Sequence, residues 1–204
     1  MSDINLNLLL AIFIGFGSTL IQSLTGFGLS IVSTPLFLMV YDPKQVVLIL
    51  QVICVVINIF FALALRKNID FRFLLILFIG SLFGQPLGLL IFQIAPNNIL
   101  KIFVSLVILF FLIIMQLNHK KITETTLKTG ITGVLSGILT TATSMGGPPL
   151  ILYLANANRD KVSMRATCIA YFAITNISNI LSIGTFISVI IIGLIGKYIK
   201  LDKL

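Results

Sequence analysis

The chain has 204 residues, of which 58% are hydrophobic and only 10% are charged, and its mean hydropathy is +1.14. A soluble domain carries about 25% charged residues, so this composition excludes a soluble globular protein and predicts a polytopic membrane protein. The net charge of +8 comes without a basic patch interleaved with aromatic residues, which excludes nucleic acid as a partner.

The first half of the chain, 1–117, begins with an apolar segment, 6–40, that is too long for one straight crossing of about 20 residues. Thr25-Gly26-Phe27-Gly28 and Pro35 interrupt this segment. The apolar runs that follow are continuous, which favours helices over barrel strands. They predict spans at about 46–65, 71–92 and 99–117, and the polar stretch 118–128 predicts a cytoplasmic loop at the midpoint.

The second half, 129–204, begins with another broken segment, 130–155, interrupted by Gly146-Gly147-Pro148-Pro149. Shorter spans are expected at about 166–183 and 186–199. The two broken segments share an order of residues, which predicts that the halves are repeats. The matching pairs are Gly15 with Gly133, Thr25 with Thr143 and Gly28 with Gly146 at an offset of 118, and Pro35 with Pro149 at an offset of 114.

The positions of lysine and arginine distinguish two topologies. If each broken segment crosses the membrane, the basic residues divide six against eight. If each is re-entrant, twelve share one side and only Lys44 and Lys101 lie opposite, which the positive-inside rule favours. The predicted fold is therefore an all-α polytopic membrane protein with two inverted repeats. Each repeat opens with a Gly/Pro-broken, re-entrant helix pair, and the N-terminus lies outside and the C-terminus in the cytoplasm.

The two breaks predict a ligand site, because backbone that is not helical at membrane depth must line a protein-buried or watery cavity. A helix is expected to begin after each break, at about Leu29 and Pro149, and helix N-termini attract anions. The predicted substrate-binding residues are Gln22, Thr25, Gly26, Phe27, Gly28, Thr143, Ser144, Gly146, Gly147 and Pro148. A second ring is predicted from Gln51, Asn58, Gln85, Asn176 and Asn179.

Each of these residues also has a structural interpretation. The hydroxyls can bond back to their own helix turn, and the amides can link neighbouring helices; for Asn58 and Asn176 the two roles are evenly balanced. All six acidic residues lie in loops or tails, which argues against a cation site and against a buried carboxylate proton relay. No nucleophile with a base accompanies the single histidine, His119, so no enzyme, metal or cofactor is expected.

At these residues the sequence resembles the TauE/SafE family of membrane permeases. The resemblance lies in the motifs Gly15-x-Gly17…Thr25-Gly26-Phe27-Gly28…Pro35 and Gly133-x-x-x-Gly137…Ser144-Met145-Gly146-Gly147-Pro148-Pro149, and in the stretches 158–161 and 165–167. It implies two related halves and transport of sulfite, sulfonates or other small anions across the bacterial cytoplasmic membrane. The second half has fewer spans than the family pattern, so the resemblance leads us to expect either that a C-terminal helix is missing or that a partner subunit supplies it.

The predicted function is a secondary transporter for a small, sulfur-containing anion that works by alternating access. A passive anion channel and a non-transporting membrane scaffold are the alternatives. The predicted partners are the lipid bilayer and the anionic substrate, and a homo-oligomer is left open.

Overall fold

The computed structural model describes residues 2–26, 29–117, 124–155 and 160–201, and the side chains within these ranges except those at 2–8, 24–25, 112, 115–117, 155 and 185–201. The described chain forms eight α-helices and one short 3-10 helix, which confirms the all-helical prediction. Three of the described helical segments are long and apolar enough to cross a membrane: Pro43–Ala64, Phe71–Ile94 and Lys161–Gly184.

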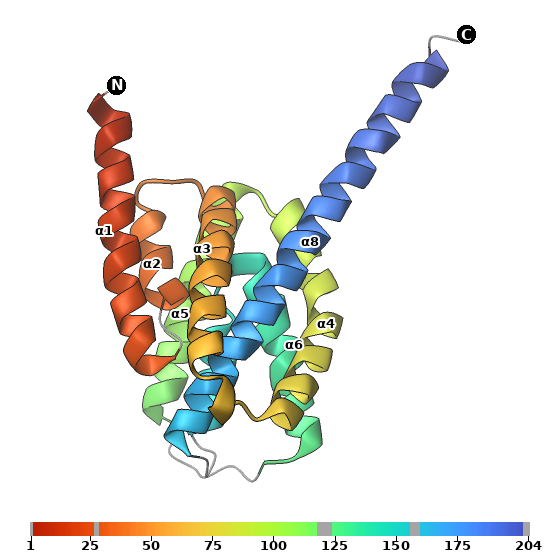
Figure 1. The fold of residues 1–204 in the computed structure, drawn as a ribbon. Helices are drawn as coiled ribbons and strands as arrows, with labels where there is room; N and C mark the ends of the chain where they lie inside the picture. The colour runs from red at the N-terminus through yellow and green to blue at the C-terminus, as the bar shows by residue number, and fades with distance from the viewer. Residues whose placement is uncertain (1, 27–28, 118–123, 156–159, 202–204) are drawn as a thin grey trace.

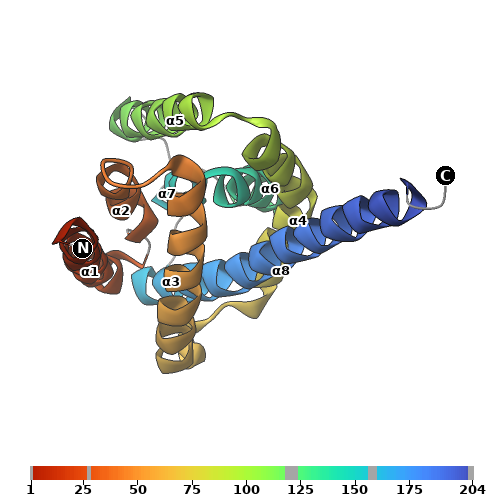
Figure 2. The same cartoon turned by 90° about the horizontal axis from the view of Figure 1, so that it is seen from above.

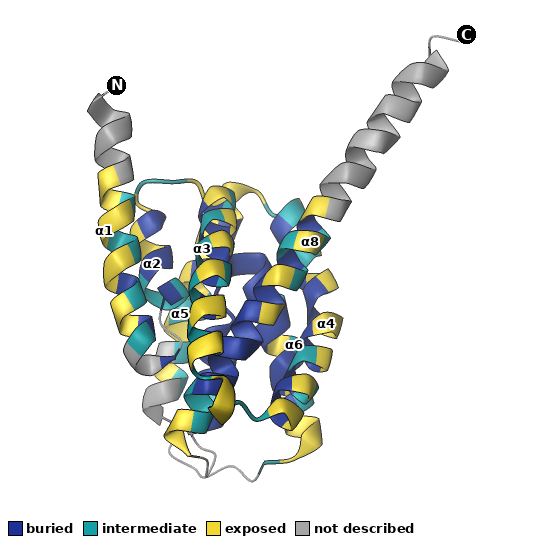
Figure 3. Ribbon diagram, viewed as in Figure 1, coloured by how far each residue is buried: buried dark blue, intermediate teal, exposed yellow. Residues whose placement is uncertain are grey.

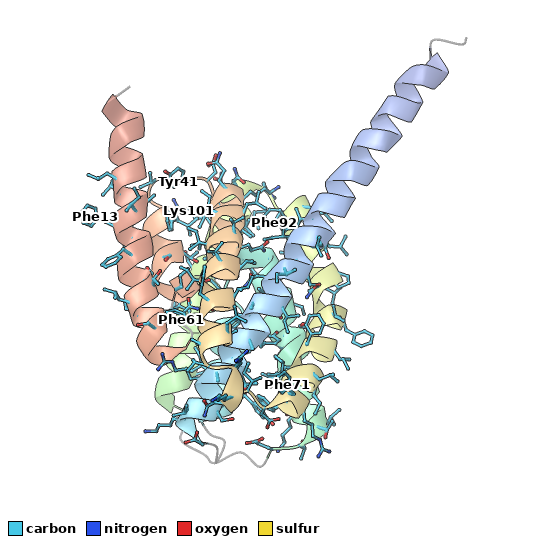
Figure 4. All side chains as sticks on the ribbon, in the orientation of Figure 1. Phe13, Tyr41, Phe61, Phe71, Phe92 and Lys101 are labelled. Carbon is cyan, nitrogen blue, oxygen red and sulfur yellow. The ribbon has the colours of Figure 1, made fainter. Side chains whose placement is uncertain are left out.

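The first broken segment forms a helical hairpin of α1 (Ser2–Thr25) and α2 (Leu29–Phe37). Gly26 follows α1 with φ at +85°, a left-handed conformation that glycine adopts without a steric cost. α1 runs inward from the end of the molecule that carries the N-terminus, and α2 returns to that end (Figure 1). We call this end the N-terminal face; it also carries Tyr41 and Lys101 (Figure 4).

The second broken segment forms another hairpin, of α6 (Thr126–Thr143) and α7 (Gly147–Ala155). Ser144 follows α6 in the left-handed region with φ at 60°, and its N–H donates to the carbonyl of Thr140 at 2.9 Å. Pro148 and Pro149 lie in the first turn of α7, where a missing N–H breaks no intrahelical bond. α6 begins at the opposite end of the molecule from α1, so the two hairpins enter from opposite ends (Figure 1).

Three helices connect the hairpins. α3 (Pro43–Ala64) begins with proline at its first position and is followed by the 3-10 helix η1 (Arg66–Asn68). α4 (Phe71–Ile94) is capped by Asp70, whose carboxylate accepts from the N–H of Phe73 at 3.0 Å. α5 is Asn97–Leu117. The bounds of these helices lie close to the ends of the apolar runs in the sequence.

The last helix, α8 (Lys161–Leu201), is continuous over the two spans that the sequence suggests at 166–183 and 186–199. The junction between the two expected spans holds one glycine, Gly184, and no proline, and one glycine costs about 1 kcal/mol in a helix without ending it. The far end of α8 therefore lies at the same end of the molecule as the start of α1 (Figure 1). This arrangement differs from the expected placement of the two termini on opposite sides.

The described helices expose many large apolar side chains, while the interior holds polar as well as apolar ones (Figure 3). Among the described side chains of α1, only Ser18 and Gln22 are buried, whereas Phe13 is 67% exposed and Phe16 is 66% exposed. Large apolar side chains are also exposed along α3 and α4, including Phe60 and Phe83. An apolar exterior around a partly polar interior is what a lipid environment requires.

Small residues bring α4 and α6 together in the most extensive helix contact of the described chain. A Cβ atom at Gly137 would lie 2.5 Å from the carbonyl oxygen of Ser81, and one at Gly84 would lie 3.0 Å from the backbone nitrogen of Ile138. Only glycine permits backbones this close. The short helix α7 lies near the centre of the helix arrangement. Seen from above, it is between α2, α3 and α6 (Figure 2).

Candidate anion-binding site

A small cavity lies where the two hairpins meet, and it is lined by residues from both breaks and from α3 and α8. It leaves about 20 Å³ for the centres of water-sized molecules, which is more than the 10–15 Å³ that one water needs. None of the described residues that line it is charged. The lining residues are Gln22, Leu29, Ser30, Ile31, Cys54, Asn58, Ser144, Gly146, Gly147, Phe172 and Asn176.

The N-termini of α2 and α7 both contribute to the wall of this cavity. Leu29, Ser30 and Ile31 form the first turn of α2, and each carries a backbone N–H. In α7, Pro148 and Pro149 remove two of the donors that a first turn normally offers, which leaves Gly147 as the donor at its start. Both helix ends still carry a partial positive charge, so the cavity favours an anion over a cation.

The break between α6 and α7 is held by tight packing within the second hairpin. The hydroxyl of Ser136 donates to the carbonyl of Gly146 at 2.6 Å. A Cβ at Gly146 would overlap the hydroxyl of Thr140 and lie 2.8 Å from the carbonyl oxygen of Ser136. Gly147 is different, because a Cβ there would meet only the flexible side-chain ends of Ile31, at 3.3 Å, and Ile151, at 3.7 Å. Gly146 is therefore needed by the fold, whereas Gly147 leaves space on the cavity side.

Amide side chains cross the cavity wall. The Gln22 amide on α1 donates to the Asn58 carbonyl oxygen on α3, and both residues are buried. Asn176 on α8 donates to the carbonyl of Phe172 at 2.7 Å, while its own Oδ1 is buried without a partner in the described part of the chain. The hydroxyl of Ser144 is also buried and unpaired among the described residues. These groups could accept or donate new bonds to a ligand without losing a helix bond.

The structure thus brings together four of the predicted substrate-binding residues, Gln22, Ser144, Gly146 and Gly147, and two of the predicted second ring, Asn58 and Asn176. Thr143 is buried, but its hydroxyl donates to the carbonyl of Leu139 at 2.7 Å and does not line the cavity. Pro148 is buried in the first turn of α7, also outside the lining. Phe27, Gly28 and the side chain of Thr25 lie outside the described residues.

The other three amides of the predicted second ring link helices instead of lining the cavity. Gln51 donates to the carbonyl of Thr140 at 3.4 Å, joining α3 to α6. Gln85 on α4 accepts from the hydroxyl of Ser178 on α8 at 2.8 Å. Asn179 on α8 accepts from the hydroxyl of Thr141 at 2.7 Å. These three amides therefore have the alternative role considered in the sequence analysis, that of linking neighbouring helices.

Several lining residues were missed because they are apolar or nearly so. Cys54 and Phe172 lie one turn before Asn58 and Asn176, and the sulfur of Cys54 is 3.3 Å from the hydroxyl oxygen of Ser30. A four-residue helix period counted back from the two asparagines would have placed both on the cavity side. Ile31 carried no such signal, because its position depends on where α2 begins.

Charge is distributed unevenly between the two ends of the molecule. Lys44 and Lys101 belong to the N-terminal face. The opposite end, which we call the basic face, carries η1 and the starts of α4, α6 and α8, and Phe71 marks it in Figure 4. The described basic side chains there are Arg66, Lys67, Arg72, Lys128, Lys161 and Arg165.

Comparison with known protein families gives one match that covers most of the chain. The family described as sulfite exporter TauE/SafE matches residues 11–199. No curated protein and no solved structure matches the chain. The matched range includes every described residue that lines the cavity.

Proposed function

Because this chain belongs to the sulfite exporter TauE/SafE family, whose members are membrane transporters of sulfur anions, we propose that it binds a small sulfur oxyanion in the cavity between its two hairpins. Sulfite and short sulfonates are the substrates that we favour. Transport would proceed by alternating access, with one hairpin and its associated helices moving against the other. We further propose that the protein resides in a bacterial cytoplasmic membrane.

The observation that carries this proposal is the meeting of two broken segments at one uncharged, partly polar cavity. Two helix N-termini supply positive potential and N–H donors there. Unpaired buried groups, Ser144 Oγ and Asn176 Oδ1, lie in the same wall. An oxyanion can accept from the hydroxyl and the backbone N–H groups, and a protonated anion such as bisulfite can also donate to Oδ1.

The size of the cavity bears on the mechanism. About 20 Å³ holds water but not a sulfur oxyanion with several oxygens. Substrate entry therefore requires a local expansion, and the Gln22–Asn58 bond between α1 and α3 is the contact that closes this wall. We propose that the Gln22–Asn58 hydrogen bond opens when the substrate enters the cavity.

The arrangement of the hairpins supports the inverted-repeat hypothesis without establishing it. The hairpins enter from opposite ends, as two halves related by an axis in the membrane plane would. We propose that the basic face is cytoplasmic, because among the described basic side chains up to Arg165 it holds all but Lys44 and Lys101.

Flux measurements on purified protein in liposomes test this function. A transporter should give saturable uptake of labelled sulfite and counterflow when unlabelled sulfite is trapped inside. Flux without saturation or counterflow would indicate a passive anion channel instead. No flux and no binding of sulfite, sulfate or sulfonates would indicate a scaffold and would contradict the proposal.

A further inference from the structure

Arg165 lies directly against the break of the first hairpin, although it belongs to α8. A Cβ at Gly26 would lie 2.7 Å from Arg165 Cγ and 3.3 Å from its Cα and Cβ. Glycine at position 26 thus serves both the left-handed backbone and the close approach of the arginine stem. The second turn of α8 and the end of α1 meet at this contact.

The charge of Arg165 lacks a counter-charge in the described part of the chain. Its Nε is buried and has no hydrogen-bond partner among the described residues. The nearby carboxylate of Asp160 instead accepts from the N–H of Ser163 at 3.0 Å, where it caps α8. By contrast, Lys44 at the other end donates to the carbonyl of Gln93 at 3.1 Å. Arg165 is half-buried, and a buried N–H donor without a partner costs free energy unless an acceptor such as an anion joins it.

Both elements that meet at Arg165 continue into the cavity wall. On α8, Arg165, Phe172 and Asn176 are separated by seven and four residues, which places them on one helix face; Phe172 and Asn176 line the cavity. On the hairpin side, Gly26 lies between the lining residues Gln22 and Leu29. With a rise of 1.5 Å per residue, Arg165 is about 10 Å below Phe172, toward the basic face.

We propose that Arg165 is the charged contact that captures the substrate anion between the basic face and the cavity. This inference rests on the proposed transport function. The planar guanidinium presents parallel N–H donors that match two oxygens of one oxyanion, which suits sulfite and sulfonates better than a halide. The anion is held at Arg165 before it passes the break at Gly26 and enters between the helix N-termini.

Four variants in the liposome uptake assay test this role. Arg165→Gln and Arg165→Met both remove the charge, and Met keeps an apolar stem over Gly26. We expect each to raise the KM for sulfite by roughly 10- to 100-fold, the range for losing a hydrogen bond to a charged group, with a smaller change in kcat. Arg165→Lys keeps the charge but loses the parallel donors, so its KM should lie between that of the wild type and those of the neutral variants. Lys161→Gln, which removes an exposed charge one turn earlier on α8, is the matched control and should leave KM unchanged.

The KM effect separates a charge contact from a packing role, because a packing defect would reduce the amount of folded protein and kcat without a selective rise in KM. A folded Arg165→Gln or Arg165→Met protein with wild-type KM, beside an active wild type, would overturn the assignment of Arg165 and leave the transport function intact. An inactive wild type would instead contradict the proposed function itself.

Discussion

At the scale of single residues, Ser144 combines two unfavourable features at the wall of the cavity. It is the described non-glycine residue with a positive φ, at 60°, and its hydroxyl is buried without a partner in the described chain. Left-handed backbone costs a residue with a side chain about 1–2 kcal/mol. Such features persist where function requires them, which is consistent with the proposed role of Ser144 as a donor to the anion.

We therefore expect Ser144→Gly to stabilise the protein and impair binding. Glycine removes the left-handed strain and the unpaired hydroxyl, so the free energy of unfolding should rise by about 1 kcal/mol. The same variant should raise the KM for sulfite, because one donor is lost. Thermal unfolding in detergent and liposome uptake measure the two effects. A variant that is less stable and binds sulfite as the wild type does would refute this role for Ser144.

At the scale of helices, Gly15 and Gly133, which the predicted repeat would pair, have different surroundings. A Cβ at Gly133 would lie 3.2 Å from the Cα of Gly80 on α4 and would overlap the carbonyl of Leu77. A Cβ at Gly15 would meet nothing within 4 Å. α6 is thus fixed against α4, whereas α1 contacts chiefly α2. The two helices match in sequence but not in packing, so the internal symmetry stays a proposal.

This difference makes Gly133→Leu and Gly15→Leu a matched pair. Gly133→Leu must push α6 away from α4, and we expect a loss of about 1–3 kcal/mol or more, as for other overpacked sites. Gly15→Leu should be neutral or slightly stabilising, because leucine favours a helix over glycine. Size-exclusion profiles and thermal midpoints in detergent compare the two. Equal loss in both variants would show that the packing of α1 and α6 is alike.

The positions of most helices could be predicted from the sequence, because aspartate, proline and glycine mark their ends. The breaks at Gly26 and Ser144 followed from the same signals. The continuity of α8 could not be predicted. The sequence suggested two short spans, but the single glycine between them, Gly184, does not end the helix. For the site, Asn58 and Asn176 could be named, but nothing local distinguishes them from Gln85 or Asn179, which link helices. A buried amide can either line the cavity or link two helices, and only the packing of the helices determines which of the two it does.

At the scale of the whole molecule, the separation of the N-terminal face from the basic face predicts the result of accessibility labelling. Single cysteines replace Lys44 and Lys161 in a background where Cys54 and Cys168 are serine. An impermeant thiol reagent applied to intact cells should label the cysteine at 44 and not the one at 161, because these residues lie on opposite faces. Labelling of both would show that the hairpin of α6 and α7 crosses the membrane instead of returning.

The cavity between the hairpins is the central element of the proposed mechanism. A substitution at Gly147, which lines the cavity, tests this element directly. Gly147 lines the cavity, so we expect leucine there to fill it. The first added atom, Cβ, would meet only the flexible ends of Ile31 and Ile151, so we expect the fold to tolerate the change. Gly146→Leu is unsuitable as a test, because it would collide with Thr140 and Ser136. Gly17→Leu, where a Cβ meets nothing within 4 Å, is the control for adding leucine near the first hairpin.

The decisive measurement is the uptake of labelled sulfite by liposomes that contain the wild type, Gly147→Leu or Gly17→Leu, each at equal amounts of folded protein. If the anion passes through the cavity between the two breaks, the wild type and Gly17→Leu will take up sulfite and Gly147→Leu will not. Uptake by Gly147→Leu at the wild-type rate would contradict a substrate path through this cavity.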